Sequence, residues 1–289
     1  METNYFTTLD EIFKHPAVAE LGFPPANQEA LVQNLLHDNI NSRSQVEMLF
    51  AINAALQRSS GEAPLDAAAR RQWPEIFAQA ICHHVLLDMQ SPRDLDHAEA
   101  RWLLTEMSRP GSDHLTEAEL AALVLVSATA LSTPAYFKQA VLLAVHASIL
   151  TSRSITPETV NMLNQVIFGL GGFDGFRASR EEVEVLLDVN TSASYWPDRG
   201  NELLEWQEFF VGTLRAHLLH DAWSPRIVDH AEAGWLAEWL RQMPPPLDRN
   251  TSRLLDALNL EARQMPEFLE GNPEEVHGRI RTRTSNLHG

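Results

Sequence analysis

The sequence has very little cysteine and no long hydrophobic run, and both absences limit what the chain can be. With a single cysteine, Cys82, no internal disulfide bond can form. The longest apolar stretches, 120–131 and 140–150, are too short to cross a bilayer and are interrupted by Ser, Thr or His. The first six residues contain a glutamate where a signal peptide needs positive charge followed by an apolar run. We therefore expect a cytoplasmic protein that makes no contact with a membrane.

Basic residues are also scarce. The chain has 22 Lys and Arg against 39 Asp and Glu, which gives a formal net charge of −17. A field of this sign repels phosphate backbones, so we expect no binding to nucleic acid. Hydrophobic residues make up 44% of the 289 residues, which is typical of a folded chain with one large core or two ordinary ones. The partner we expect is a protein or a small ligand.

The chain carries an internal repeat. Residues 73–103 align with residues 206–236 without a gap, and 16 of the 31 aligned positions are identical. Upstream, residues 42–49 align with residues 179–186. The aligned residues there are 137 positions apart, whereas those of 73–103 and 206–236 are 133 apart, so one connecting loop is four residues shorter in the second copy. The similarity predicts a tandem duplication of a helical module, with copies over about 17–137 and 140–269. We expect a first module over 1–137, a second over 138–269, and a flexible tail without an apolar face over 270–289.

Helix starts can be read from a recurring short pattern. A Ser, Thr or Asp follows an apolar residue, and an acid, amide or hydroxyl residue usually follows three positions later. This is the capping box, in which the first side chain accepts a hydrogen bond from a free N–H of the first helical turn. It predicts helices that begin near Ser42, Asp96, Thr116, Thr156, Ser179, Asp229 and Asp248. Long helices are expected over 73–90 and 203–222, and the lack of apolar–polar alternation predicts an all-α fold of capped helix-turn-helix units.

The residues with the strongest potential for chemistry are histidines and aspartates that occur in both segments. His84 and Asp88 lie one helical turn apart, as do His217 and Asp221. A loop of about seven residues then leads to a further histidine in each segment. Two histidines with two or three carboxylates could bind a divalent metal ion. The candidate ligands are His84, Asp88, His97, His217, Asp221 and His230.

A structural interpretation of the same residues competes with the metal site, and we favour it. His84 can be a core histidine that is satisfied by Asp88 or by a loop carbonyl. Asp96 is explained as a cap, and His97 at the first helical position would face solvent. Because the set recurs together with its tryptophans, it is typical of a repeated structural lock. We therefore expect no cofactor, and the alternative is a divalent metal ion.

The phrase Asp174-Gly-Phe-Arg-Ala-Ser-Arg-Glu-Glu182 resembles the "Asp-Gly-x-Ile-Ser-x-x-Glu" turn of TerB-like tellurite-resistance proteins. The resemblance covers short turns in both segments, about a fifth of the chain. It implies a compact all-helical domain with a role linked to metal stress, in which acidic residues bind metal.

No catalytic motif is present in the sequence. Cys82 lies beside His83 and His84, as an activated nucleophile can, but the aligned residue of the second segment is Arg215. We interpret Cys82 as a small core or boundary residue. The expected function is that of a non-enzymatic, TerB-like helical scaffold or binding protein. The alternative is a metal-binding protein, or a metal-dependent enzyme, that uses the repeated His and Asp residues.

Overall fold

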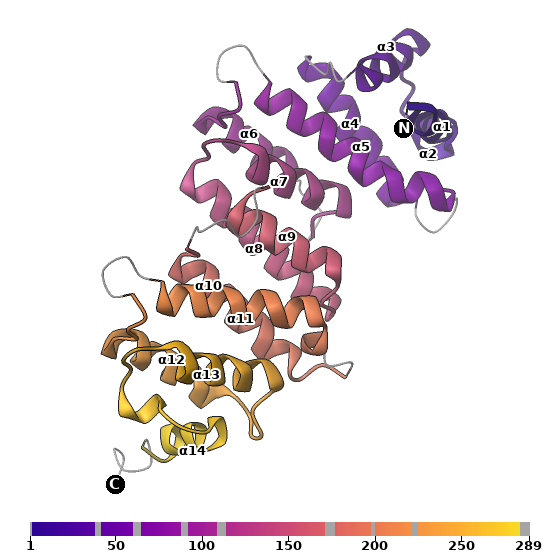
Figure 1. Ribbon diagram of the computed structural model, residues 1–289. Coiled ribbons are helices and arrows are strands. Elements are labelled where there is room, and N and C mark those ends of the chain that lie inside the picture. The colour runs from indigo at the N-terminus through magenta and orange to yellow at the C-terminus, as the bar shows by residue number, and fades with distance from the viewer. Residues whose placement is uncertain are drawn as a thin grey trace. The chain divides into compact units, whose positions relative to one another are not determined.

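The chain is all-helical (Figure 1). The computed structural model describes residues 2–37, 42–59, 65–87, 92–108, 114–170, 177–197, 200–220 and 225–283. These residues form 14 α-helices and no strand, and two isolated β-bridges join loops, Asp94 to Ser132 and Ile227 to Gln264. The expectation of an all-α fold is confirmed.

The chain divides into two units, residues 1–145 and 146–289, and the border falls inside helix α8 (Ala135–Ser152). It therefore lies a few residues beyond the 137/138 border expected from the sequence. The other helices of the first unit are α1 (Glu2–Lys14), α2 (Pro16–Ala19), α3 (Pro25–Leu36), α4 (Arg43–Arg58), α5 (Ala67–Leu86), α6 (His97–Met107) and α7 (Glu117–Thr129). Those of the second unit are α9 (Pro157–Phe168), α10 (Arg180–Ala193), α11 (Leu204–Leu219), α12 (His230–Gln242), α13 (Arg249–Glu261) and α14 (Pro273–Arg283), with short 3-10 helices at Gly200–Glu202 and Glu267–Leu269.

All seven helix starts that the capping pattern predicts are confirmed. Each cap side chain accepts a hydrogen bond from a backbone N–H of the first turn. At Asp96 and Asp229 the capping box is complete, because the carboxylates of Glu99 and Glu232 accept a hydrogen bond from the backbone N–H of the cap residue. The helix expected to start at 73 begins earlier, since Asp66 caps α5 by accepting from the N–H of Ala69 at 2.6 Å.

In each unit one long helix forms the centre of the packing. In the first unit α5 packs against α1, α4 and α7, and its inward face is filled by Trp73, Phe77 and Ile81. In the second unit α11 packs against α9, α10 and α13 (Figure 1). Its inward face holds the buried side chains of Trp206, Phe210 and Leu214. Burying aromatic side chains of this size supplies a large share of the hydrophobic stabilisation of each unit.

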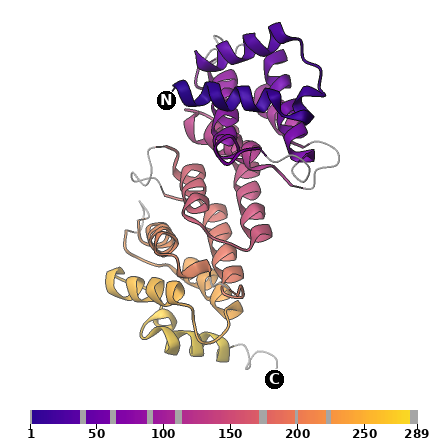
Figure 2. The ribbon, with the colours of Figure 1, turned by 90° about the vertical axis from the view of Figure 1, so that its right-hand side faces the viewer.

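The expectation of a flexible tail over 270–289 is wrong for residues 273–283. These residues form α14, which packs against α12 and α13, and the three helices stay together when the view is turned (Figure 2). Val276 and Ile280, one turn apart, are buried and provide the apolar face that the sequence reading overlooked. Residues 284–289 lie outside the described part of the chain.

Among the helices that the structure describes, none combines the length and the apolar character needed to cross a membrane.

Candidate functional site

His217 lies inside the second unit as a bonded core residue. Its side chain is buried on α11, and its Nδ1 lies 2.9 Å from the backbone oxygen of Ala178, just before α10 begins. Its ring meets that of Trp235 edge to face at a centroid distance of 5.8 Å. The histidine thus connects α11 to the start of α10 and to α12. This is the loop-carbonyl arrangement that the structural interpretation requires.

His84 has a similar neighbour in the first unit. Its ring meets that of Trp102 edge to face at 5.7 Å. An arginine at the start of a capped helix also covers each tryptophan. The Cζ atom of Arg43 of α4 lies 5.6 Å from the ring centroid of Trp102, and that of Arg180 of α10 lies 5.3 Å from the ring centroid of Trp235. The same His–Trp–Arg stack therefore occurs in both units.

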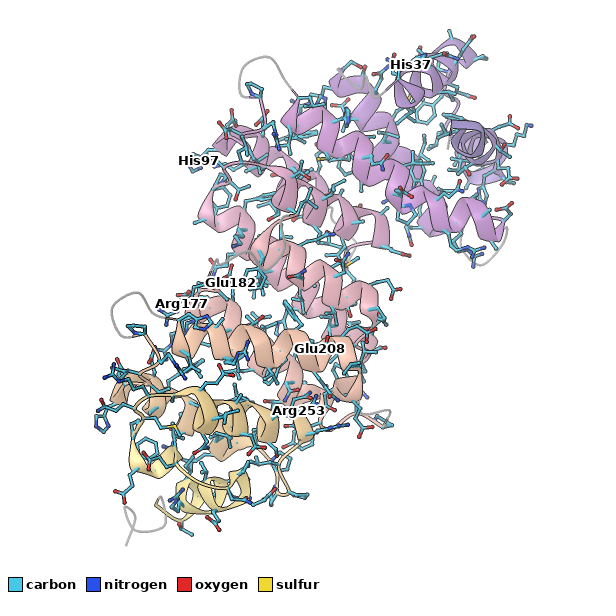
Figure 3. All side chains as sticks on the ribbon, in the orientation of Figure 1. His37, His97, Arg177, Glu182, Glu208 and Arg253 are labelled. Atoms are coloured by element: carbon cyan, nitrogen blue, oxygen red, sulfur yellow. The ribbon has the colours of Figure 1, made fainter. Side chains whose placement is uncertain are left out.

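Of the four remaining candidate ligands, the structure describes only the two histidines, and neither joins His84 or His217 in a metal-binding cluster. His97 and His230 are exposed at the first positions of α6 and α12, and His97 stacks on the ring of Tyr136 (Figure 3). Asp88 and Asp221 lie outside the described residues. Within the part of the chain that the structure does describe, no three His, Cys, Asp or Glu side chains come close enough together to hold a metal ion.

A buried asparagine links the central helix to its neighbours in each unit, and the sequence reading did not assign it a role. Asn53 accepts the indole N–H of Trp73 at 3.1 Å and donates to Thr116, the cap of α7, at 3.0 Å. Asn190 accepts the indole N–H of Trp206 at 3.1 Å and donates to Asp248, the cap of α13, at 3.3 Å. The signal was available, because Asn53 and Asn190 align in the repeat.

Two pockets of similar size lie beside these caps. One, of about 280 Å³, is lined by Asn53 and Trp73 in the first unit, and the other, of about 310 Å³, is lined by Ser194 and Asp248 in the second. Asn53, Trp73, Ser194 and Asp248 are already engaged in hydrogen bonds of the asparagines and caps.

A larger open groove, of about 500 Å³, runs between α9 and α11 in the second unit. Its lining includes Val160, Phe209 and Gly212, which we refer to as its floor, and an added Cβ at Gly212 would meet nothing within 4 Å. The full lining consists of Pro157, Val160, Asn161 and Asn164 from α9, and of Glu205, Glu208, Phe209, Gly212, Thr213 and Arg215 from α11.

The polar groups of this groove are only partly used. Thr213 is 1% exposed, and its hydroxyl has no hydrogen-bond partner among the described residues. Arg215 forms an ion pair with Glu261, in which Nη1 lies 3.0 Å from Oε1. Glu205 and Glu208 are exposed on α11 without a cationic partner in the described part of the chain, and Figure 3 shows Glu208 on that helix. The groove is thus apolar at its floor and acidic at one wall.

The aligned face of α5 in the first unit has a different lining. The residues aligned with Glu205, Gly212, Thr213 and Arg215 are Gln72, Gln79, Ala80 and Cys82. Gln72 is hydrogen bonded to Thr8 of α1, which packs on α5 at this side.

Cys82 is buried in α5, and burial raises the pKa of its thiol. A raised pKa reduces the fraction of thiolate, which is the reactive form. This agrees with the interpretation of Cys82 as a core or boundary residue.

Comparison of the chain with protein-family models, with curated proteins and with solved structures gives no match.

Proposed function

We propose that the chain is a non-enzymatic helical binding protein whose binding surface is the groove between α9 and α11. The observation that carries the proposal is a contrast between two sets of residues. Several residues that recur in both segments, among them the buried asparagines, tryptophans and capping aspartates, are engaged in packing, capping and buried hydrogen bonds. Of the six groove residues on α11, five differ from their aligned residues on α5, and Glu208 alone is retained as Glu75.

The contrast separates the residues that stabilise each unit, here called the framework, from the residues that line the groove. His217, Trp206 and Asn190 hold the second unit together, and their aligned residues hold the first. Among the groove residues, Phe209 also packs against Trp206 and Phe168, and Arg215 pairs with Glu261. Glu205 and Glu208 have no cationic partner among the described residues, and an open groove with unused polar groups is a feature of binding sites. A rigid helical framework that presents one distinctive groove fits a binding protein better than an enzyme, because no activated group lies in the groove.

Three further statements belong to this proposal. The recurring His–Trp–Arg stacks and Asn–Trp hydrogen bonds support a tandem duplication. The capped turn at Ser179 supports a TerB-like build. The single buried cysteine and the acidic charge support a cytoplasmic location.

A substitution at Gly212 tests the proposal without endangering the fold. A tryptophan there would fill the groove, and replacing a helical glycine does not weaken the helix. The matched control is Gly234→Trp, at an exposed helical glycine of α12 that also faces open space. A displayed library of random peptides is selected on the wild-type chain, and the selected peptides are then tested on both variants.

We expect the selected peptides to bind the wild type and the Gly234→Trp variant but to lose binding to Gly212→Trp. Selected peptides that bind all three proteins equally would show that the groove is not the binding surface, and the proposal would be wrong.

A further inference from the structure

We propose that the groove between α9 and α11 binds an extended segment of a partner protein that carries alternating basic residues. The inference rests on the proposed function and adds the chemical class of the partner. Three features carry it: the acidic side chains of α11, the amide side chains of α9, and the buried hydroxyl of Thr213 on α11.

The acidic wall determines the charge of the partner. Glu205 and Glu208 lie on one side of α11, three residues apart, so their carboxylates are offset by about 4.5 Å along the helix axis. Neither has a cationic partner among the described residues, and the cation of the lining, Arg215, is already paired with Glu261. Basic side chains complement this wall, and the net charge of −17 attracts them over a longer range.

The amide wall determines the form of the partner. Asn161 and Asn164, one turn apart on α9, line the opposite side of the groove. An asparagine side chain offers both a donor and an acceptor, which is the complement of a peptide group with a free N–H and C=O. An extended chain exposes those groups, whereas a helix uses them internally.

In an extended chain every second side chain points to the same face, with a repeat of about 7 Å. This repeat exceeds the offset of about 4.5 Å between the two carboxylates. The long, flexible side chains of two arginines at alternate positions can converge by that difference to reach Glu205 and Glu208, while the residue between them points away from the acidic wall. The buried hydroxyl of Thr213, without a partner in the described residues, provides one further hydrogen-bonding group in the groove.

The first experiment measures the binding of a fluorescein-labelled peptide of about eight alternating Arg and Ser residues to the full chain by fluorescence anisotropy at about 150 mM salt. We expect Glu208→Gln to weaken binding about fivefold, and Glu205→Gln to weaken it by a similar factor, as expected for exposed charge pairs near the upper end of their usual range. The matched control is Glu75→Gln, which makes the same charge change at the aligned position of α5. This control should change the affinity less than twofold. An equal loss with Glu75→Gln would show that only the overall charge attracts the peptide and would overturn the inference.

The second experiment tests the contact with the peptide backbone. Methylation of the peptide nitrogens should weaken binding to the wild type about fivefold, since each lost hydrogen bond is worth about 1 kcal/mol. It should have no effect on a variant with Asn161→Ala and Asn164→Ala. Spermine, which has the charges but no peptide groups, should compete poorly. Efficient competition by spermine together with no effect of methylation would overturn the inference.

Failure here can be distinguished from failure of the proposed function. If the library selection yields acidic or neutral peptides that Gly212→Trp excludes, the groove is a binding surface and the basic class of partner is wrong. If Gly212→Trp excludes none of the selected peptides, both are wrong.

Discussion

Removing the amide of Asn190 should strongly destabilise the second unit. The side chain of Asn190 is fully buried and joins three elements. Its oxygen accepts from Trp206 at 3.1 Å and from Asn250 at 3.0 Å, and its nitrogen donates to Asp248 at 3.3 Å. Leucine has the same branching as asparagine, so Asn190→Leu removes these bonds with little change of shape.

The expected magnitude follows from the partners that remain. The indole N–H of Trp206 loses its partner inside the core, which costs about 1–3 kcal/mol. Asn250 keeps a bond to the backbone of Asn201 at 2.8 Å, and Asp248 keeps Thr251, so each of these losses costs about 1 kcal/mol. The free energy of unfolding should fall by about 3–5 kcal/mol in total.

Urea unfolding followed by circular dichroism measures the change, and hydrogen exchange of the Trp206 indole N–H by NMR assigns it to this site. A double-mutant cycle with Trp206→Phe isolates the bond. Trp206→Phe should cost about 1–2 kcal/mol less in the Asn190→Leu background than in the wild type, because the stranded donor is then removed. The control, Asn27→Leu on the exposed surface of α3, should change stability by less than about 0.5 kcal/mol. A cost below 1 kcal/mol for Asn190→Leu, or a cycle without coupling, would refute the reasoning.

Three further predictions concern titratable groups. Adding zinc, manganese or iron should leave the melting temperature unchanged, whereas a concentration-dependent rise that is lost in the His84→Gln, His217→Gln double variant would show that these residues are metal ligands. The hydrogen bond from the N–H of Ala69 lowers the pKa of Asp66, so the stabilising effect of the Asp66 carboxylate should be full above the unfolded pKa and be lost as the pH falls through the folded pKa. The difference in melting temperature between the wild type and Asp66→Ala should therefore be constant near neutral pH and shrink in acid. A difference independent of pH down to pH ~2 would contradict this. Because burial raises the pKa of Cys82, its thiol should react with Ellman's reagent slowly in the native protein and rapidly in denaturant, and fast labelling of the native protein would contradict the assignment.

Helix starts could be predicted from the sequence because capping is a local interaction. The side chain of Asp96 reaches N–H groups two and three residues away, so residue types at fixed spacing are enough to identify it. Asp66 was missed because alanine follows it at the third helical position and completes no box. The predicted helix therefore began at 73, whereas α5 begins at Ala67 and continues through Pro74.

The groove could not be predicted in the same way, because it is formed by residues about 50 positions apart in the sequence. Nothing local to Asn161 indicates that it faces Glu208 across a groove, since that relation depends on how α9 packs on α11. The hydrogen-bond partners of the buried histidines could not be predicted for the same reason. The sequence favoured His84 as a core histidine, and its aligned residue His217 is buried. The partner of His217, the carbonyl of Ala178, belongs to a distant loop, which the sequence does not reveal.

One sequence signal did point to the groove and becomes interpretable only with the structure. A glycine within a helix costs about 1 kcal/mol relative to alanine, and a buried hydroxyl without a partner costs about 1–3 kcal/mol. Gly212 and Thr213 bring both costs to a single turn of α11, whereas the aligned residues of α5, Gln79 and Ala80, bring neither. Departures from the rules of stable folding are expected where a surface serves a function. Both costs fall in the lining of the same groove, so the binding that we propose there accounts for their position, whereas stability of the helix does not.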